Sequence, residues 1–171
     1  MQRCEQDSSQ CPIFRGLSAD ERFSVLQISE VRTYETGQTI IRQGCEDSNG
    51  LWMVRSGDCE AVFELQDCTE EQLTTMHSGD IFGEVSFFDP APHSASIRAL
   101  TGCEFMFVPQ DKLDDLCQEN LLAVHKLTVN VAKNLSFKLR RLDQLTLGRN
   151  EATPLWWFGG DNGVAASVNR V

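Results

Sequence analysis

The sequence has little positive charge and no long apolar run. Its 171 residues hold 15 Lys and Arg against 25 Asp and Glu, which gives a net charge of −10. Because cations that neutralise phosphates supply much of the affinity for nucleic acid, this balance argues against DNA or RNA binding. No apolar stretch reaches the ~18 residues of a membrane span, and residues 1–7 lack the apolar core of a signal peptide. The composition therefore predicts a cytoplasmic protein that does not enter a membrane.

The sequence also lacks paired cysteines and the common catalytic motifs. Its seven cysteines are scattered and include no C-x-x-C pair, which argues against a disulfide framework or a structural zinc site. Only Cys4 and Cys11 lie near the N-terminus, two short of a four-thiolate iron–sulfur site. G-x-S-x-G, H-E-x-x-H and G-x-x-x-x-G-K-S/T are absent, and His77 and His125 are isolated. We expect a protein that is not an enzyme and holds no metal.

The middle of the chain is a series of short β-prone runs separated by Gly, Asp and Ser turns. The runs are 31–34, 39–41, 51–56, 59–65, 72–76, 94–99 and 103–108. Many short strands at near-regular spacing are typical of a double-sheet jelly roll rather than a parallel sheet. The acidic residues 67–71 fit an exposed hairpin turn. The predicted fold class is mainly β with flanking helices.

Helical patterns lie on both sides of the β region. A capping box at residues 18–21 predicts a short helix to about Ser29, with Phe23 and Leu26 turned inward. A short helix is expected at 110–117 and a long one at 119–147. The long helix carries one apolar stripe, made of Val124, Leu127, Val131, Leu135, Leu139, Leu142 and Leu145. This stripe either packs on the β-roll or pairs with its copy in a homodimer through helix 119–147.

The stretch from Gly79 to Ser86, followed by the loop 92–95, is the most informative part of the sequence. It reads as a strand, a glycine-bounded turn, one short helical turn and a loop that enters the next strand. A helix start leaves backbone N–H groups unpaired, and its dipole favours an anion. Glu84 can accept a proton from a hydroxyl group, and the loop can close over the same anion. A sugar phosphate fits this combination.

The residues of this stretch resemble the phosphate-binding cassette of the cyclic-nucleotide-binding domain family, in its Crp/Fnr-like form. Residues 12–17, 40–44 and 51–57 are similar to the family's entry motif and early strands. The resemblance covers about residues 12–147 and implies a double-stranded β-helix, or β-roll, at 31–109 followed by helices at 110–147. Residues 148–171 form a Trp-rich C-terminal tail.

The resemblance implies a ligand site for cAMP or cGMP within the cassette. Glu84 would accept the ribose 2′-hydroxyl proton, and the amides of Glu84 and Val85 would face the cyclic phosphate. Ser94 and the Ala95 amide would cap the phosphate from the other side. The full set of expected ligand-binding residues is Phe82, Gly83, Glu84, Val85, Ser86, Pro92, His93, Ser94 and Ala95.

Two positions depart from the family pattern. His93 stands where the family has an arginine that pairs with the phosphate, and histidine offers neither a permanent charge nor a bidentate fork. Phe137 and Lys138 stand where relatives tend to present Thr or Ser to the purine. A cyclic nucleotide then binds weakly, or another small anion replaces it. The alternatives are that His93 is a surface loop residue without a ligand role and that Glu84 only satisfies local amides.

These observations predict a non-enzymatic regulatory or signalling module. An alternative is a protein-interaction scaffold that has lost its ligand, with the cluster Leu155–Phe158 as a contact for a protein partner. A truncated transcription regulator is a further alternative. It is opposed by the acidic charge and by a tail at 149–171 that is too short for a helix-turn-helix, so we expect no DNA partner.

Overall fold

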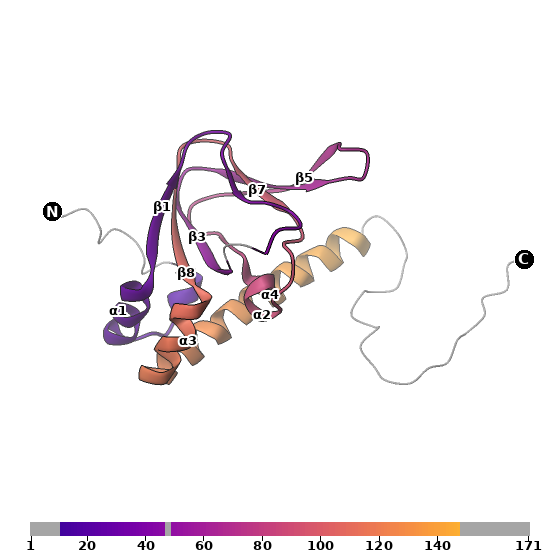
Figure 1. Ribbon diagram of the computed structural model, residues 1–171. Coiled ribbons are helices and arrows are strands. Elements are labelled where there is room, and N and C mark those ends of the chain that lie inside the picture. The colour runs from indigo at the N-terminus through magenta and orange to yellow at the C-terminus, as the bar shows by residue number, and fades with distance from the viewer. Residues whose placement is uncertain (1–10, 47–48, 148–171) are drawn as a thin grey trace, which may run out of the picture. The chain divides into compact units, whose positions relative to one another are not determined.

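The computed structural model describes residues 11–46 and 49–147, with side chains up to residue 144 (Figure 1). The chain divides into two compact units, one ending at Asn134 and the other beginning at Leu135. The elements are η2 (Pro12–Phe14), α1 (Ala19–Ile28), β1 (Glu30–Tyr34), β2 (Thr39–Ile41), β3 (Gly50–Ser56), β4 (Cys59–Glu64), β5 (Glu70–Met76), β6 (Ile81–Phe82), α2 (Glu84–Phe88), β7 (Ser96–Ala99), β8 (Cys103–Pro109), α3 (Gln110–Glu119) and α4 (Leu121–Leu147). Within the described residues, every helix is too short or too polar to span a bilayer.

The strands form two antiparallel sheets of four strands each. Their orders are β1-β8-β3-β6 and β2-β7-β4-β5, so most neighbours in a sheet are distant in sequence. This arrangement confirms the predicted β-roll with flanking helices. Strand ends lie within about two residues of the predicted ones, since ladder partners rather than local propensity determine where pairing stops. In Figure 1 the β4–β5 hairpin projects away from the roll.

Strand β3 contributes to two hydrophobic clusters because its side chains alternate between the faces of its sheet. Leu51 and Met53 pack in the cluster that includes the helices. Trp52 and Val54 point into the roll, where they join a second cluster. A continuous run of apolar residues is therefore required here, in contrast to the polar–apolar alternation of a strand with one face in water.

Aromatic side chains dominate the cluster inside the roll. The Trp52 ring stacks on Phe82 with centroids 5.8 Å apart and an interplanar angle of 7°. Phe105 meets Trp52 edge-on at 6.0 Å. The Arg32 guanidinium lies 3.9 Å from the Phe107 ring centroid, a cation–π arrangement that closes one side of the cluster. Offset and edge-on pairs of this kind add to the free energy gained from burial alone.

Helix α1 begins with the predicted capping box but turns a different face inward. The Ser18 hydroxyl accepts a hydrogen bond from the Glu21 amide at 3.2 Å, and a Glu21 carboxylate oxygen accepts from the Ser18 amide at 2.6 Å. The prediction that Phe23 and Leu26 turn inward is wrong, since Phe23 is 62% exposed and Leu26 is also exposed. Val25 and Glu21 are the buried residues. They lie four residues apart on one face, and Lys126 neutralises the buried carboxylate.

The first half of α4 belongs to the unit that ends at Asn134 and contributes to its core. Leu127 and Val131 are fully buried, as the packing alternative for the stripe requires. Asn130 lies beside them and donates hydrogen bonds to the carbonyls of Ile13 (3.0 Å) and Arg15 (2.7 Å). These bonds satisfy backbone groups of η2 and hold it against the helix.

The second half of the stripe is in the other unit and is partly exposed. Leu135 is half-buried, Leu139 and Leu142 are exposed, and the side chain of Leu145 lies outside the described residues. The homodimer prediction therefore rests on this second half.

The ion pair between Lys126 and Glu21 predicts a pH-dependent stability. Lys126 and the hydrogen bonds from Ser18 lower the pKa of the Glu21 carboxyl. A lowered folded-state pKa stabilises the fold above the unfolded pKa of about 4.3, and this contribution is lost as the pH falls through the folded-state pKa. Lys126→Gln is therefore expected to lower Tm near neutral pH, with an effect that decreases as the pH falls through the folded-state pKa of Glu21. Melting curves of Lys126→Gln and of the exposed control Lys133→Gln test this, and an equal loss in both variants would contradict it.

Candidate ligand site at the Gly83–Ala95 cassette

The cassette begins at a turn that requires glycine. Gly83 has a φ of 82°, in the left-handed region, and forms the N-cap of the five-residue helix α2. A Cβ on Gly83 would lie 2.6 Å from the Gly50 carbonyl oxygen and 3.1 Å from Cδ1 of Trp52. The chain therefore approaches β3 closely at this point, and that approach places α2 against the roll.

Helix α2 has one buried and one exposed side. Glu84 is only 5% exposed, and Ser86 is also buried. Val85 and Phe88 face outward. Since a buried carboxylate must be compensated by hydrogen bonds or charge, the burial of Glu84 marks this position as a polar site within the roll. Ser86 lies beside it on the same short helix.

His93 connects the two ends of the cassette. Its Nδ1 lies 3.0 Å from the Ser86 hydroxyl, and the side chain is only 6% exposed. The alternative that His93 is a surface loop residue is therefore wrong. The loop is held because the His93 amide donates to the Cys45 carbonyl at 2.9 Å and the His93 carbonyl accepts from the Gly44 amide at 2.8 Å.

The other predicted site residues differ in accessibility. Phe82 is buried in the aromatic cluster, where it stacks on Trp52 rather than facing solvent. Pro92 and Ser94 are exposed, and Ala95 is half-buried. The structure thus buries Glu84, Ser86 and His93, brings Ser86 and His93 into contact, and leaves Pro92 and Ser94 accessible.

Two supports of this site were not predicted from the sequence. The first is Trp52, whose ring lies beside the Gly83 turn and whose buried Nε1 has no hydrogen-bond partner among the described residues. The second is the segment Gly44–Cys45, which pairs with the His93 backbone. Gly44 was recognisable as a turn residue, but its pairing with a loop almost fifty residues later has no signature in one sequence.

A metal role finds no support in the described part of the chain. No group of three or more His, Cys, Asp or Glu side chains is placed to hold an ion there.

Burial raises the pKa of the Cys11 thiol to about 11 and that of Cys59 to about 12, so both remain protonated near neutral pH. Cys4 lies outside the described residues. His77 is exposed and pairs with Asp58 at 2.7 Å, which raises its pKa.

The Ser86–His93 hydrogen bond predicts a measurable loss on mutation. Ser86→Ala removes this hydrogen bond between two buried side chains, which is expected to lower the free energy of unfolding by about 0.5–1.5 kcal/mol. Ser94→Ala, at an exposed position of the same cassette, should change it by less than about 0.5 kcal/mol. Urea denaturation of both variants measures the difference. Equal losses of unfolding free energy in the two variants would show that the Ser86–His93 hydrogen bond does not stabilise the fold.

Comparison with known proteins identifies the family. The sequence profile described as "cyclic nucleotide-binding domain" matches residues 31–120, which is more than half of the chain. The chain belongs to the cyclic nucleotide-binding domain family. The match covers the roll, the cassette and α3, so the resemblance drawn from the cassette residues is confirmed for family and fold.

The relatives of this cyclic nucleotide-binding domain are described as regulatory proteins. A cAMP-dependent protein kinase regulatory subunit from Mycosarcoma maydis is 34% identical over 88 residues, which is 52% of this chain and 16% of that protein. The crystal structure of the Thermus thermophilus catabolite activator protein matches with a TM-score of 0.65 and 28% identity, covering 79% of this chain and 63% of that one. A c-di-GMP responsive global regulator of Xanthomonas campestris matches with a TM-score of 0.61 and 26% identity, covering 71% and 59%.

The chain spans less than two-thirds of the length of each of these relatives. The activities and partners of the whole proteins are therefore not carried over to this chain.

Proposed function

We propose that this domain is a non-enzymatic, cytoplasmic regulatory module that binds a cyclic nucleotide weakly, or another small anionic ligand, at the Gly83–Ala95 cassette. The observation that supports the proposal is the burial of Glu84, Ser86 and His93 within the stretch that resembles the family cassette, with Ser86 and His93 3.0 Å apart. Buried polar side chains are costly unless they have partners, and they concentrate at functional sites. The relatives named above are described as responding to cAMP and to c-di-GMP, which supports a nucleotide ligand without choosing one.

The cassette residues have chemistry suited to a sugar phosphate. Glu84 would accept the ribose hydroxyl proton, and the amides of Glu84, Val85 and Ala95 would donate to phosphate oxygens. Phe82, Gly83, Pro92 and Ser94 would shape and cap the site. His93 would bind a phosphate group more weakly than an arginine would, because it cannot form a bidentate, permanently charged pair. Losing such a pair costs about 1.5–3 kcal/mol, or roughly one to two decades of affinity, so we expect weak binding.

Ligand binding would act by shifting an equilibrium between two packing arrangements of the long helix and the tail. A ligand can shift this equilibrium only by the difference between its affinities for the two arrangements. We propose that the domain is a homodimer through helix 119–147, and the exposure of Leu139 and Leu142 on that helix supports this assembly. The cluster Leu155–Phe158, which lies outside the described residues, is proposed as a contact for a protein partner.

Hydrogen exchange on the full chain tests the proposal. Addition of cAMP or cGMP is expected to slow exchange at the amides from Gly83 to Ala95, because a bound phosphate satisfies N–H groups that otherwise reach water. The β4–β5 turn at residues 65–69 is the internal control, since it lies away from the cassette and should not change. Unchanged exchange in the cassette with both nucleotides and with a panel of anionic metabolites would refute the proposal.

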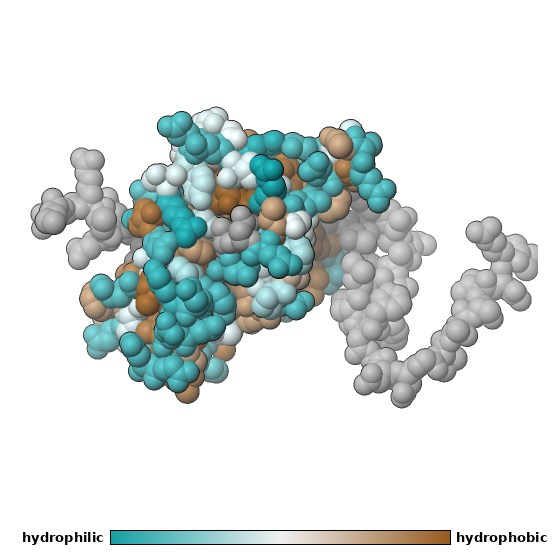
Figure 2. Space-filling view, in the orientation of Figure 1, coloured by the Kyte–Doolittle hydropathy of each residue, from teal (hydrophilic) through white to brown (hydrophobic). Residues whose placement is uncertain are grey.

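A scaffold without a ligand is the second candidate. The Ser86–His93 hydrogen bond favours it, since the side chain at the phosphate-pairing position already has a partner inside the protein. On the face shown in Figure 2, hydrophobic residues are separate spots among hydrophilic ones, so a partner would contact another surface. Deleting residues 149–171 should then abolish capture of a partner, while neither the full chain nor the deletion responds to a nucleotide.

A further inference from the structure

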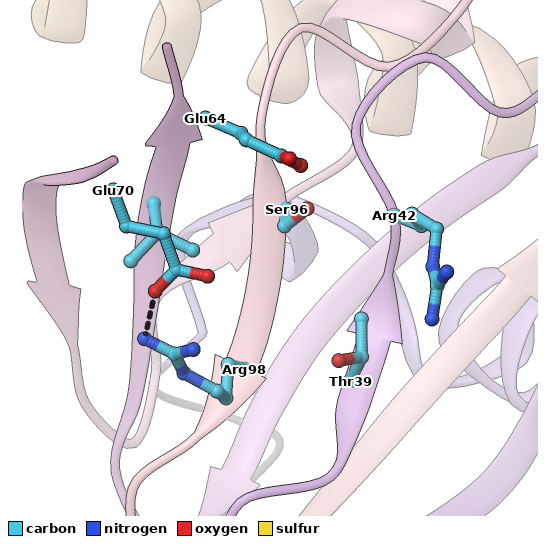
Figure 3. Close-up of a pocket in the computed structure, with 7 residues that line it drawn as sticks. Thr39, Arg42, Glu64, Glu70, Ser96 and Arg98 are labelled. Atoms are coloured by element: carbon cyan, nitrogen blue, oxygen red, sulfur yellow. Dashed lines mark ion pairs between the residues drawn. The ribbon is translucent and has the colours of Figure 1, made fainter. Parts of the chain in front are cut away.

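A polar hollow lies on the outer face of the sheet β2-β7-β4-β5, away from the aromatic cluster inside the roll. Ala61 and Ile97 point into the roll, so the alternate residues Val62, Ser96 and Arg98 face outward. The hollow has a volume of about 150 Å³, with buried Val62 as its apolar floor. This is enough space for a molecule of a few heavy atoms, and Figure 3 shows the side chains around it.

Two opposite charges in the hollow form no ion pair with the described residues. Arg98 is neutralised, because its guanidinium contacts Glu60 at 2.8 Å and Glu70 at 2.8 Å. Arg42 follows β2 and Glu64 ends β4, and neither forms an ion pair within the part of the chain that the structure describes. In Figure 3 the Glu64 carboxylate extends toward the side of the hollow that Arg42 occupies, with the Ser96 hydroxyl beneath it.

Hydrogen bonds fix the backbone positions from which these two side chains extend. The side chain of Gln43 bonds the Glu64 backbone twice, donating to its carbonyl at 3.1 Å and accepting from its amide at 2.8 Å. The Gln43 amide also donates to the Ser96 hydroxyl at 2.9 Å. The backbone beside Arg42 and the backbone of Glu64 are therefore fixed relative to each other. Only the two side chains then have to be ordered when a ligand binds, which keeps the entropy cost of binding low.

We infer that this hollow is a second ligand site, for a small zwitterion that carries an ammonium and a carboxylate group. The carboxylate pairs with the Arg42 guanidinium, which matches its geometry in a bidentate contact. The ammonium pairs with Glu64, and the hydroxyls of Thr39 and Ser96 supply further hydrogen bonds. A molecule with one charge satisfies only one side of the hollow. This site is separate from the cassette, and the inference does not depend on a nucleotide binding there.

The second site and the cassette share one segment of chain. Arg42 lies on the segment whose next residues, Gly44 and Cys45, exchange hydrogen bonds with the His93 backbone. A ligand that fixes Arg42 therefore acts on the same loop that positions His93. The coupling is reciprocal, so a cassette ligand would change the affinity of the hollow by the same factor.

Titration of the full chain with glycine, β-alanine and γ-aminobutyrate, followed by amide resonances, tests the inference. These probes carry the same two charges at increasing separation. Saturable shifts are expected at Thr39, Arg42 and Ser96, with smaller ones at Gly44 and His93. Acetate and methylammonium, which carry one charge each, should bind at least about tenfold more weakly, since a charge-assisted contact is missing.

Variants test whether binding depends on Arg42 and Glu64 themselves or only on the overall charge of the protein. Arg42→Gln and Glu64→Gln should each abolish the saturable shifts. Arg15→Gln removes an exposed arginine elsewhere, and Glu71→Gln removes a carboxylate whose cross-strand partner is Phe63, on the opposite face of the sheet from Glu64. Both control variants should bind the zwitterions as the native chain does. The inference is overturned if no zwitterion produces saturable shifts, if acetate or methylammonium bind equally well, or if Arg42→Gln and Glu64→Gln still bind.

Discussion

Phe105→Ala is expected to lower the free energy of unfolding by about 3–5 kcal/mol, the range for removing a large aromatic side chain from a core. Phe105 is fully buried inside the roll and meets Tyr34, Trp52 and Phe82 in edge-on or tilted contacts. Its loss opens a cavity among rigid rings on several strands, and such a site collapses poorly. Urea denaturation followed by tryptophan fluorescence measures the change.

Phe23→Ala is the matched control, because it makes the same chemical change on the exposed side of α1. It should shift the free energy of unfolding by no more than about 0.5 kcal/mol. Similar losses in the two variants would show that the rings inside the roll do not form the core described above.

Gly83→Ala is expected to destabilise the protein by about 2–5 kcal/mol. Two costs add together. A residue with a Cβ in a left-handed backbone conformation costs about 1–2 kcal/mol. The clash of that Cβ with the Gly50 carbonyl costs about 1–3 kcal/mol more. Relief of the clash requires β6 or α2 to move away from β3. The buried positions of Glu84 and Ser86 depend on that contact, so the variant should also increase hydrogen exchange across the cassette.

Gly79→Ala separates the two costs. Gly79 also has a positive φ, 93°, but a Cβ there would meet nothing within 4 Å. Only the backbone cost of about 1–2 kcal/mol is expected. If Gly79→Ala destabilises as much as Gly83→Ala, the close approach of the cassette to β3 is not the cause.

Local signals in the sequence were sufficient where the interaction is local. The capping box at Ser18 and Glu21 was predictable because both hydrogen bonds join residues three apart. The buried face of α1 was not, because its apolar residues do not form one clear stripe. The face that contains Glu21 can be buried because Lys126, more than a hundred residues later, pairs with its carboxylate.

In the cassette, too, the local contacts were predictable from the sequence and the long-range contacts were not. Gly83, Glu84 and Ser86 could be predicted as neighbours because a tight turn and one helical turn place them together. The contact of Ser86 with His93 depends on how the intervening loop closes and on its pairing with Gly44 and Cys45. A single sequence carries no sign of that pairing. The sequence could therefore predict a candidate site but not the buried state of His93.

Isothermal titration of cAMP and cGMP into the native chain and His93→Arg tests the central claim most directly. We expect weak binding of both nucleotides to the native chain. His93→Arg should tighten binding by roughly one to two decades, through the charge-assisted pair that histidine lacks. No binding of either nucleotide, by the native chain or by His93→Arg, would contradict a nucleotide site at the cassette.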